Sequence, residues 1–266
     1  MSVPALLGPS DPAPATIDRP AGASPFLIVC DHAGRGIPAA LGTLGLGAAD
    51  LARHIAWDIG AAGVSDRLGA ALDATVIKQT YSRLVMDCNR APGHPTSIAP
   101  VSESTEIPGN QHVTAEEAAR REAEIFRPYH ELIAATVAAR RARGQETVLV
   151  AMHSFTPVFH GQARPWHCGV LYDRDPVFSH AVLALLRAEA GLIVGDNEPY
   201  QLSQISDYTV PVHGERNGLA CVELEIRQDL IAEPEGQAWW ARLLTDVLQM
   251  GLRGRPLGPG QSASGS

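Results

Sequence analysis

The sequence has 266 residues, which is enough for one large α/β domain or two small ones with a sizeable core. Hydrophobic residues make up 45% of the chain and charged residues 19%, a balance typical of a globular protein and not of a disordered one. The formal net charge of −8 argues against binding to nucleic acid or to an anionic membrane surface, and no apolar run approaches the ~20 residues that span a bilayer.

The cysteines and the first residues of the chain are used to predict the cellular compartment. None of the four cysteines has the C-x-x-C spacing of a zinc knuckle, so we expect reduced and mostly buried thiols. The chain starts without the basic and then apolar segments of a secretory signal. These features predict a cytoplasmic protein, because thiols stay reduced there. The cysteines are Cys30, Cys88, Cys168 and Cys221.

We expect a single α/β domain over residues 24–252. Residues 1–23 are rich in Pro, Ala and Ser and predict an N-terminal arm, and the Gly/Ser/Pro-rich residues 253–266 predict a disordered tail. Between them, strands and helices alternate, which predicts a mostly parallel or mixed central sheet with helices on both faces. Strands are predicted at 26–30, 74–79, 147–152, 168–173, 192–195 and 218–227, helices at 48–72, 114–143, 175–190 and 234–252, and loops at 91–113 and 196–217.

Two histidines lie at the ends of predicted strands. The apolar run Phe26–Cys30 is followed by Asp31 and His32, and the run Thr147–Met152 is followed by His153. Ligands of open α/β sheets bind at the carboxyl ends of the strands, so both imidazoles could reach one metal ion. Alternatively, each histidine is an ordinary hydrogen-bonding residue. Asp31 could orient an imidazole instead of binding the metal itself.

A catalytic zinc site usually has three protein ligands and one open position for water. We select Asp58 as the third ligand because it follows Trp57 in a stretch otherwise too apolar to favour a carboxylate. The alternative for Asp58 is a helix cap. The sequence therefore predicts about one Zn²⁺ per chain, bound by His32, Asp58 and His153.

Two arginines and an asparagine follow the strand predicted at 74–79. Arg83 and Asp87 belong to a mainly apolar run, and Asn89 and Arg90 come directly after it. Arginine can bind a carboxylate through two parallel hydrogen bonds, and asparagine adds a neutral donor. This segment therefore predicts an anion site and a substrate with a carboxylate. The alternative is a surface ion pair between Arg83 and Asp87, which would contribute little stability.

The last predicted strand has a polar face, because Glu223, Glu225 and Arg227 point to the same side by alternation. A polar stripe in an interior strand is costly unless it is satisfied, and a glutamate beside a zinc-bound water is the usual general base for amide hydrolysis. We assign Glu225 as this base and leave Glu223 open as the alternative. A Glu225–Arg227 ion pair on an edge strand is the structural alternative. His213, in the preceding loop, could hold substrate or a developing oxyanion, although a histidine in such a loop is most often only exposed.

Taken together, six motifs resemble the N-formylglutamate amidohydrolase family. They occur in family order over about residues 26–230. The motifs are Asp31-His-Ala-Gly34, Trp57-Asp58, Tyr81-Ser-Arg-Leu-Val-Met-Asp-Cys-Asn-Arg90, His153-Ser-Phe155, Gly195-Asp-Asn-Glu-Pro-Tyr200 and Glu225-Ile-Arg-Gln-Asp229.

The resemblance implies a zinc-exopeptidase-like, zinc-carboxypeptidase-like α/β fold and hydrolysis of an N-formyl amino acid to formate and the free amino acid, a reaction of amino-acid catabolism. It places the metal on His32, Asp58 and His153. Asn89 and Arg90 are similar to the pair that binds the substrate α-carboxylate in zinc carboxypeptidases of related fold. Those enzymes have a His-x-x-Glu metal motif, which is absent here because an arginine stands three residues after His32.

The predicted mechanism uses zinc to polarise the formyl carbonyl and to lower the pKa of its water, while Glu225 removes the water proton and returns it to the leaving nitrogen. Arg83 or His213 is expected to stabilise the oxyanion. The residues predicted to bind the substrate, a small-molecule carboxylate, are Asn89, Arg90 and Arg227. The alternatives are a deacylase for another N-acyl amino acid and a non-catalytic metal- or carboxylate-binding protein of the same fold. Neither nucleic acid nor membrane is expected as a partner, and the chain could be a monomer or a homo-oligomer.

Overall fold

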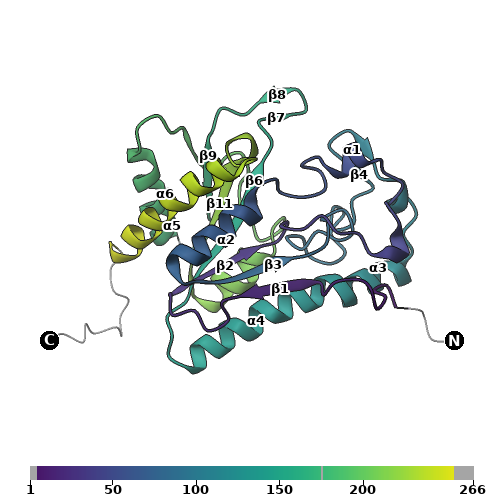
Figure 1. The fold of residues 1–266 in the computed structure, drawn as a ribbon, viewed down its shortest axis with the longest axis horizontal. Helices are drawn as coiled ribbons and strands as arrows, with labels where there is room; N and C mark the ends of the chain where they lie inside the picture. Colours follow the sequence, from purple (N-terminus) through teal and green to yellow (C-terminus); the bar gives the residue numbers. More distant parts are fainter. Residues whose placement is uncertain (1–4, 175, 255–266) are drawn as a thin grey trace.

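The computed structural model describes residues 5–174 and 176–254 and is built on a seven-stranded sheet (Figure 1). In spatial order its strands are β1 (Ala15–Asp18), β3 (Thr75–Gln79), β2 (Phe26–Cys30), β6 (Val148–Phe155), β11 (Ala220–Arg227), β9 (Cys168–Leu171) and β10 (Val194–Asp196). The four strands from β3 to β11 are parallel, β1 is antiparallel to β3, and β9 and β10 run against β11. The predicted mixed sheet is therefore confirmed.

Helices cover both faces of this sheet, as predicted (Figure 1). One face carries α2 (Ala61–Leu72), α5 (Pro176–Ala188) and α6 (Pro234–Arg253), and the other carries α3 (Ala115–Arg121), the π-helical turn η3 (Glu122–Phe126) and α4 (Arg127–Ala142). The alternation of side chains along a strand divides the apolar residues between two cores. In β2, for example, Ile28 packs with α2, α5 and α6, whereas Val29 packs with α4.

The structure contains elements that the sequence prediction misses. β1 lies within residues 1–23, which were predicted as an arm, and it pairs in register with β3. The helix predicted at 48–72 is instead two helices, α1 (Ala48–Leu51) and α2, with residues 52–60 between them. The remaining short elements are η1 (Ala39–Leu41), β4 (Val101–Ser102), β5 (Thr105–Glu106), η2 (Pro108–Asn110), β7 (Val158–Phe159), β8 (Gln162–Ala163), η4 (Val210–Gly214), η5 (Glu215–Asn217) and η6 (Gln228–Leu230).

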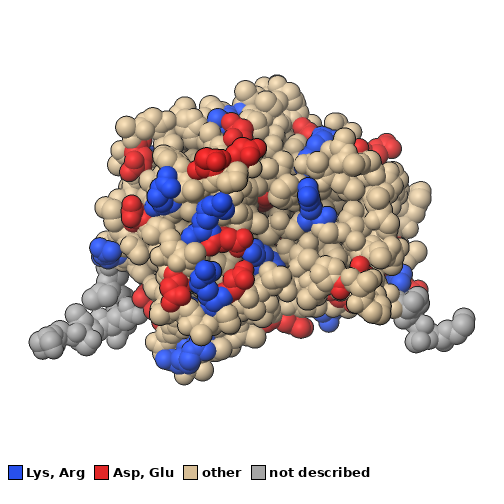
Figure 2. Space-filling view, viewed as in Figure 1, with Lys and Arg blue, Asp and Glu red and all other residues tan. Residues whose placement is uncertain are grey.

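Four further points concern the charged surface, membrane-spanning helices, the cysteines and the C-terminal residues. Acidic and basic side chains are interspersed on the face shown in Figure 2. Within residues 5–174 and 176–254, no helix combines the length and apolarity needed to cross a membrane. The four cysteines are buried and none of them is in a disulfide, as predicted. The tail predicted at 253–266 lies, apart from its first two residues, outside the described part of the chain.

The parallel strands bring distant residues to one place. Because β2, β6 and β11 run in the same direction, their carboxyl ends meet at one edge of the sheet. His32 follows β2 by two residues, and in the register of β6 with β11 His153 lies opposite Glu225. The fold therefore brings His32, His153 and Glu225, three of the predicted site residues, to this edge.

Candidate metal centre and active-site cavity

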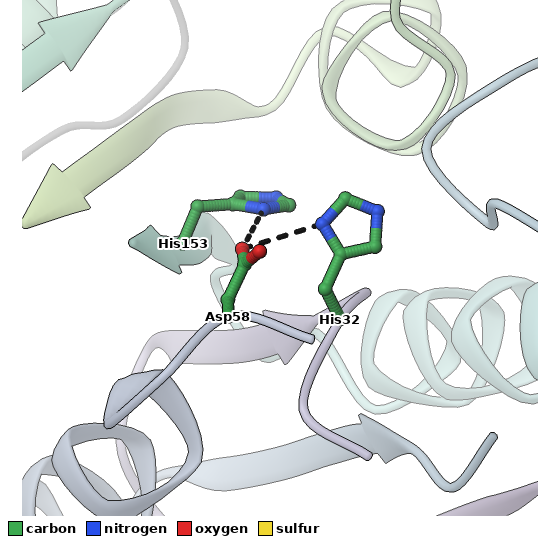
Figure 3. A group of neighbouring side chains, drawn as sticks. All are labelled: His32, Asp58 and His153. Atoms are coloured by element: carbon green, nitrogen blue, oxygen red, sulfur yellow. Dashed lines mark hydrogen bonds and ion pairs between the residues drawn. The ribbon is translucent and has the colours of Figure 1, made fainter. Parts of the chain in front are cut away.

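Three side chains predicted to bind a metal meet at the carboxyl edge of the sheet (Figure 3). His32 follows β2, His153 lies in β6, and Asp58 lies in the loop before α2. Oδ2 of Asp58 is 2.9 Å from Nδ1 of His153 and 3.3 Å from Nδ1 of His32. One ligand atom from each residue lies within 4.8 Å of the other two, a spacing that a single metal ion can bridge.

Backbone contacts hold Asp58 between the two histidines. The N–H group of Asp58 donates to the carbonyl of His32 at 3.0 Å, and the N–H group of Ser154 donates to Oδ2 of Asp58 at 3.2 Å. Gly60 then starts α2 with a φ of +83°, and a Cβ atom there would lie 2.1 Å from the carbonyl oxygen of Ile231. Only glycine tolerates both this conformation and this close approach, so Gly60 allows the turn from Asp58 into the helix.

A second carboxylate orients each histidine from the far side of its ring. Nε2 of His32 lies 2.8 Å from Oδ1 of Asp87, and Nε2 of His153 lies 3.0 Å from Oδ2 of Asp31. Thr209 donates a hydrogen bond of 2.6 Å to the other oxygen of Asp31. Metal-binding histidines usually bond a carboxylate or a carbonyl through the second ring nitrogen, which directs the first nitrogen toward the ion. The donor set therefore fits a bound metal through the two Nδ1 atoms.

The electrostatics of this group favour positive charge between the side chains. Burial opposes the charged form of Asp58, but both histidines outweigh it and hold the pKa of Asp58 far below its usual value. Burial likewise opposes the charged form of His153, but Glu223, Asp31 and Asp58 raise its pKa well above the usual value. The charged carboxylates thus stabilise either protonated imidazoles or a cation in their place.

Two glutamates of β11 face the same site. Glu223 and Glu225 are 3% and 5% exposed, and Oε2 of each has no hydrogen-bond partner among the described residues. Burial raises the pKa of each side chain to about 8. β11 lies between β6 and β9, so the alternative of an ion pair on an edge strand is wrong. Unpartnered buried carboxylates are costly, which indicates a role toward a ligand.

A cavity of about 600 Å³ lies over the candidate metal centre and is lined by both glutamates. Arg83 lines it and bonds Oδ2 of Asp87 through Nη2 at 2.7 Å. Asn89 and Arg90 also line it, and Nη1 of Arg90 donates to Oδ1 of Asp207 at 2.9 Å. The other residues that line the cavity are His32, His54, Ile55, Leu84, Thr96, Ala99, Val101, Ser102, Glu103, His153, Ser154, Phe159, Pro199, Tyr200, Gln201 and Ser206.

Two predicted site residues are placed elsewhere, which corrects those predictions. His213 is buried in η4, with its Nε2 atom 2.9 Å from Nδ1 of His130 and the two rings stacked 5.2 Å apart, because η4 packs against α4. Arg227 ends β11 and turns to Asp229, to which its Nε atom donates at 2.8 Å. Neither residue lines the cavity.

Sequence reasoning missed the contacts made by Asp87 and Asp207. Asp87 holds both His32 and Arg83 in the buried site, whereas the alternative given for this segment was an Arg83–Asp87 ion pair at the surface. Asp207 comes from a segment predicted to be a loop, and only the fold brings it to Arg90. The signal that could have found Asp87 is its place directly after the apolar run Leu84–Met86, because a buried carboxylate needs a partner.

A family model described as N-formylglutamate amidohydrolase matches residues 24–232 of the chain. The chain belongs to the N-formylglutamate amidohydrolase family. The family predicted from the six motifs is therefore confirmed. No protein with a curated description matches this family member.

Two solved structures resemble this family member over nearly its whole length. The gene product Atu2144 from Agrobacterium tumefaciens is 37% identical, with a TM-score of 0.90 over 93% of this chain and 98% of that one. N-formylglutamate amidohydrolase from Ralstonia eutropha JMP134 is 20% identical, with a TM-score of 0.64 over 91% of this chain and 98% of that one. The second likeness concerns the fold alone.

Proposed function

We propose that this family member is a metal-dependent amidohydrolase that releases formate from an N-formyl amino acid. The observation that carries the proposal is a cavity lined by His32, His153 and the unpartnered carboxylate of Glu225, with Asp58 placed to complete a group of three side chains that could hold a metal ion. The family to which the chain belongs and the name of the Ralstonia protein support the same reaction.

Two histidines and one carboxylate form a usual ligand set for catalytic zinc, so Zn²⁺ is the ion that His32, Asp58 and His153 would hold. A bound zinc supplies a Lewis acid that polarises the amide carbonyl and lowers the pKa of its water. Asp87 and Asp31 keep the two imidazoles oriented for this task.

The other cavity residues provide the acid–base and binding steps. Glu225, opposite His153 in the sheet, accepts the proton of the attacking water and returns it to the leaving nitrogen. The guanidinium of Arg83 lines the cavity and is anchored by Asp87, which suits it to stabilise the developing oxyanion. Arg90 binds the substrate carboxylate, because within the described residues only its Nη1 atom is engaged.

The second candidate is a deacylase for a larger acyl group. The cavity of about 600 Å³ favours it, because a formyl group needs only a narrow pocket. A third class, a binding protein without catalysis, has no use for the buried carboxylate of Glu225 beside the metal ligands. Formate release from N-formyl amino acids, compared with acid release from the N-acetyl and N-succinyl analogues, distinguishes these functions.

The first experiment is elemental analysis of the purified wild type and of the double variant His32→Ala/His153→Ala. We expect about one zinc per wild-type chain and none in the variant. A second double variant, His94→Ala/His112→Ala, changes two histidines outside the candidate metal centre and should keep its zinc. Wild-type protein that neither contains metal nor takes up added zinc would eliminate the proposed chemistry.

A further inference from the structure

The arginines at the cavity differ in their partners. Arg83, which lines the cavity, bonds a carboxylate oxygen of Asp87 at 2.7 Å. Arg90, which also lines it, bonds a carboxylate oxygen of Asp207 at 2.9 Å. Arg164, directly after β8, has no carboxylate partner among the residues that the structure describes. A guanidinium without such a partner is the one that a ligand carboxylate could take.

Two aromatic rings hold the guanidinium of Arg164 at the border of the cavity. Its central carbon lies 4.5 Å from the ring centroid of Phe159 and 4.8 Å from that of Tyr200. Nη1 of Arg164 donates to the Tyr200 hydroxyl at 2.8 Å. Phe159 and Tyr200 both line the cavity, and Arg164 is half-buried beside them. Side chains from β7 and from the segment 196–217 therefore fix the position of this cation.

These contacts leave hydrogen-bond donors of Arg164 available. A planar guanidinium that lies over a ring keeps its N–H groups in its own plane, where they can reach other partners. Within the described part of the chain, Nη1 is the side-chain nitrogen of Arg164 that makes a hydrogen bond. Nε and Nη2 are then left as the pair that can bind a carboxylate through two parallel hydrogen bonds.

The positive charge of Arg164 also acts on groups inside the cavity. Burial is the main cause that raises the pKa of Glu225, and the charge of Arg164 acts against it. Burial lowers the pKa of His54, and the same guanidinium lowers it further. Both residues line the cavity, so a ligand carboxylate there would be attracted. Glu223 adds little repulsion near pH 7, because burial raises its pKa to about 8 and keeps it protonated.

We propose that Arg164 is a specificity-determining residue that binds a carboxylate in the side chain of the substrate. The inference rests on the proposed function, in which Arg90 binds the other carboxylate, and it narrows the substrate class to N-formyl derivatives of acidic amino acids. The cavity of about 600 Å³ has room for a substrate with two carboxylates. The alternative is that Arg164 only holds the β7–β8 hairpin against Tyr200, a role that does not distinguish an acidic side chain from its neutral amide.

The kinetic test compares N-formylglutamate with N-formylglutamine, which has nearly the same shape without the side-chain charge. We expect kcat/KM to be about tenfold or more higher for N-formylglutamate. Arg164→Met keeps an apolar chain against the two rings but has no donor. It should remove this preference and leave N-formylglutamine within about threefold of wild type. Equal loss of activity on both substrates would assign Arg164 a structural role and overturn the proposal.

Arg35→Met is the matched control. The guanidinium of Arg35 lies 5.4 Å from the ring centroid of Trp57, and it too has no carboxylate partner among the described residues. Neither of these residues lines the cavity. The control thus removes the same charge and a similar aromatic contact, and its preference for N-formylglutamate should stay as in the wild type. An equal loss of preference in both variants would overturn the proposal.

The same compounds separate this inference from the proposed function. Formate release at equal kcat/KM from both would leave the proposed function standing and overturn the role of Arg164. If neither compound releases formate, titration calorimetry with the same protein measures their affinities. N-formylglutamate bound about tenfold more tightly, with the difference lost in Arg164→Met, would support Arg164 although the proposed function had failed. Equal affinities, or binding of neither compound, would overturn both.

Discussion

Nε2 of His153 lies 3.0 Å from Oδ2 of Asp31, and both side chains are almost completely buried. The contact joins the end of β2 to β6 and turns Nδ1 of His153 toward Asp58. Because the carboxylate fixes the ring nitrogen that carries the proton, it leaves the other nitrogen available to the proposed metal ion. In the proposed metal site, Asp31 would therefore orient His153 without binding the ion itself.

Asp31→Asn should weaken zinc binding by about 10- to 100-fold while the three ligands remain. The amide carries no charge, so it stabilises the ligating form of His153 less well. Competition with a chromophoric chelator measures the affinity. Thr209→Val removes only the 2.6 Å hydrogen bond to the other oxygen of Asp31 and should cause a smaller loss. Wild-type affinity in Asp31→Asn would contradict the role of this carboxylate.

Glu225→Gln should retain about one zinc per chain and lower kcat by about 10²- to 10⁴-fold. Glutamine has nearly the same size but cannot accept the proton of the attacking water. Formate release and elemental analysis of the same preparation measure both quantities. Ordinary turnover in this variant would exclude Glu225 as the base, and loss of zinc would show that the side chain supports the metal centre.

Arg90→Ala should chiefly raise KM, by about 10- to 100-fold, because a hydrogen bond to a charged group contributes about 1.5–3 kcal/mol. Steady-state kinetics with the best N-formyl substrate measures the change. Arg227→Ala is the matched control, since Arg227 bonds Asp229 outside the cavity and its removal should leave KM within about twofold. If KM rose in Arg227→Ala and not in Arg90→Ala, the result would support the sequence prediction that Arg227 binds the substrate.

The parts of the candidate site that depend on a local sequence pattern could be predicted from the sequence alone. The apolar runs before His32 and His153 predicted strands, and parallel pairing then required both histidines to reach one edge of the sheet. The acidic residue Asp58 was found because it stands out in an apolar stretch. Each of these inferences needs only a short window of residues and a general rule of sheet geometry.

The parts that were missed depend on contacts between distant segments. β1 is a four-residue edge strand with no alternation strong enough to show in the sequence, and its pairing with β3 is non-local. The segment around Asp207 is placed by hydrogen bonds from the N–H groups of Tyr208 and Thr209 to Oδ1 of Asn89. No pattern within 196–217 contains that information, because the partner lies more than a hundred residues earlier.

Glu223 should make the stability of the metal-free protein depend on pH. Burial, with Asp207 and Glu225 nearby, raises its pKa from 4.5 to about 8 although His153 acts to lower it. Between these values the folded state keeps a proton that the unfolded chain has lost, so the free energy of unfolding falls as pH rises. Glu223→Gln removes this effect and should gain roughly 5 kcal/mol over wild type between pH 4.5 and 8. Urea denaturation measures the gain, which should be absent for the exposed Glu131→Gln, and a pH-independent difference would contradict the prediction.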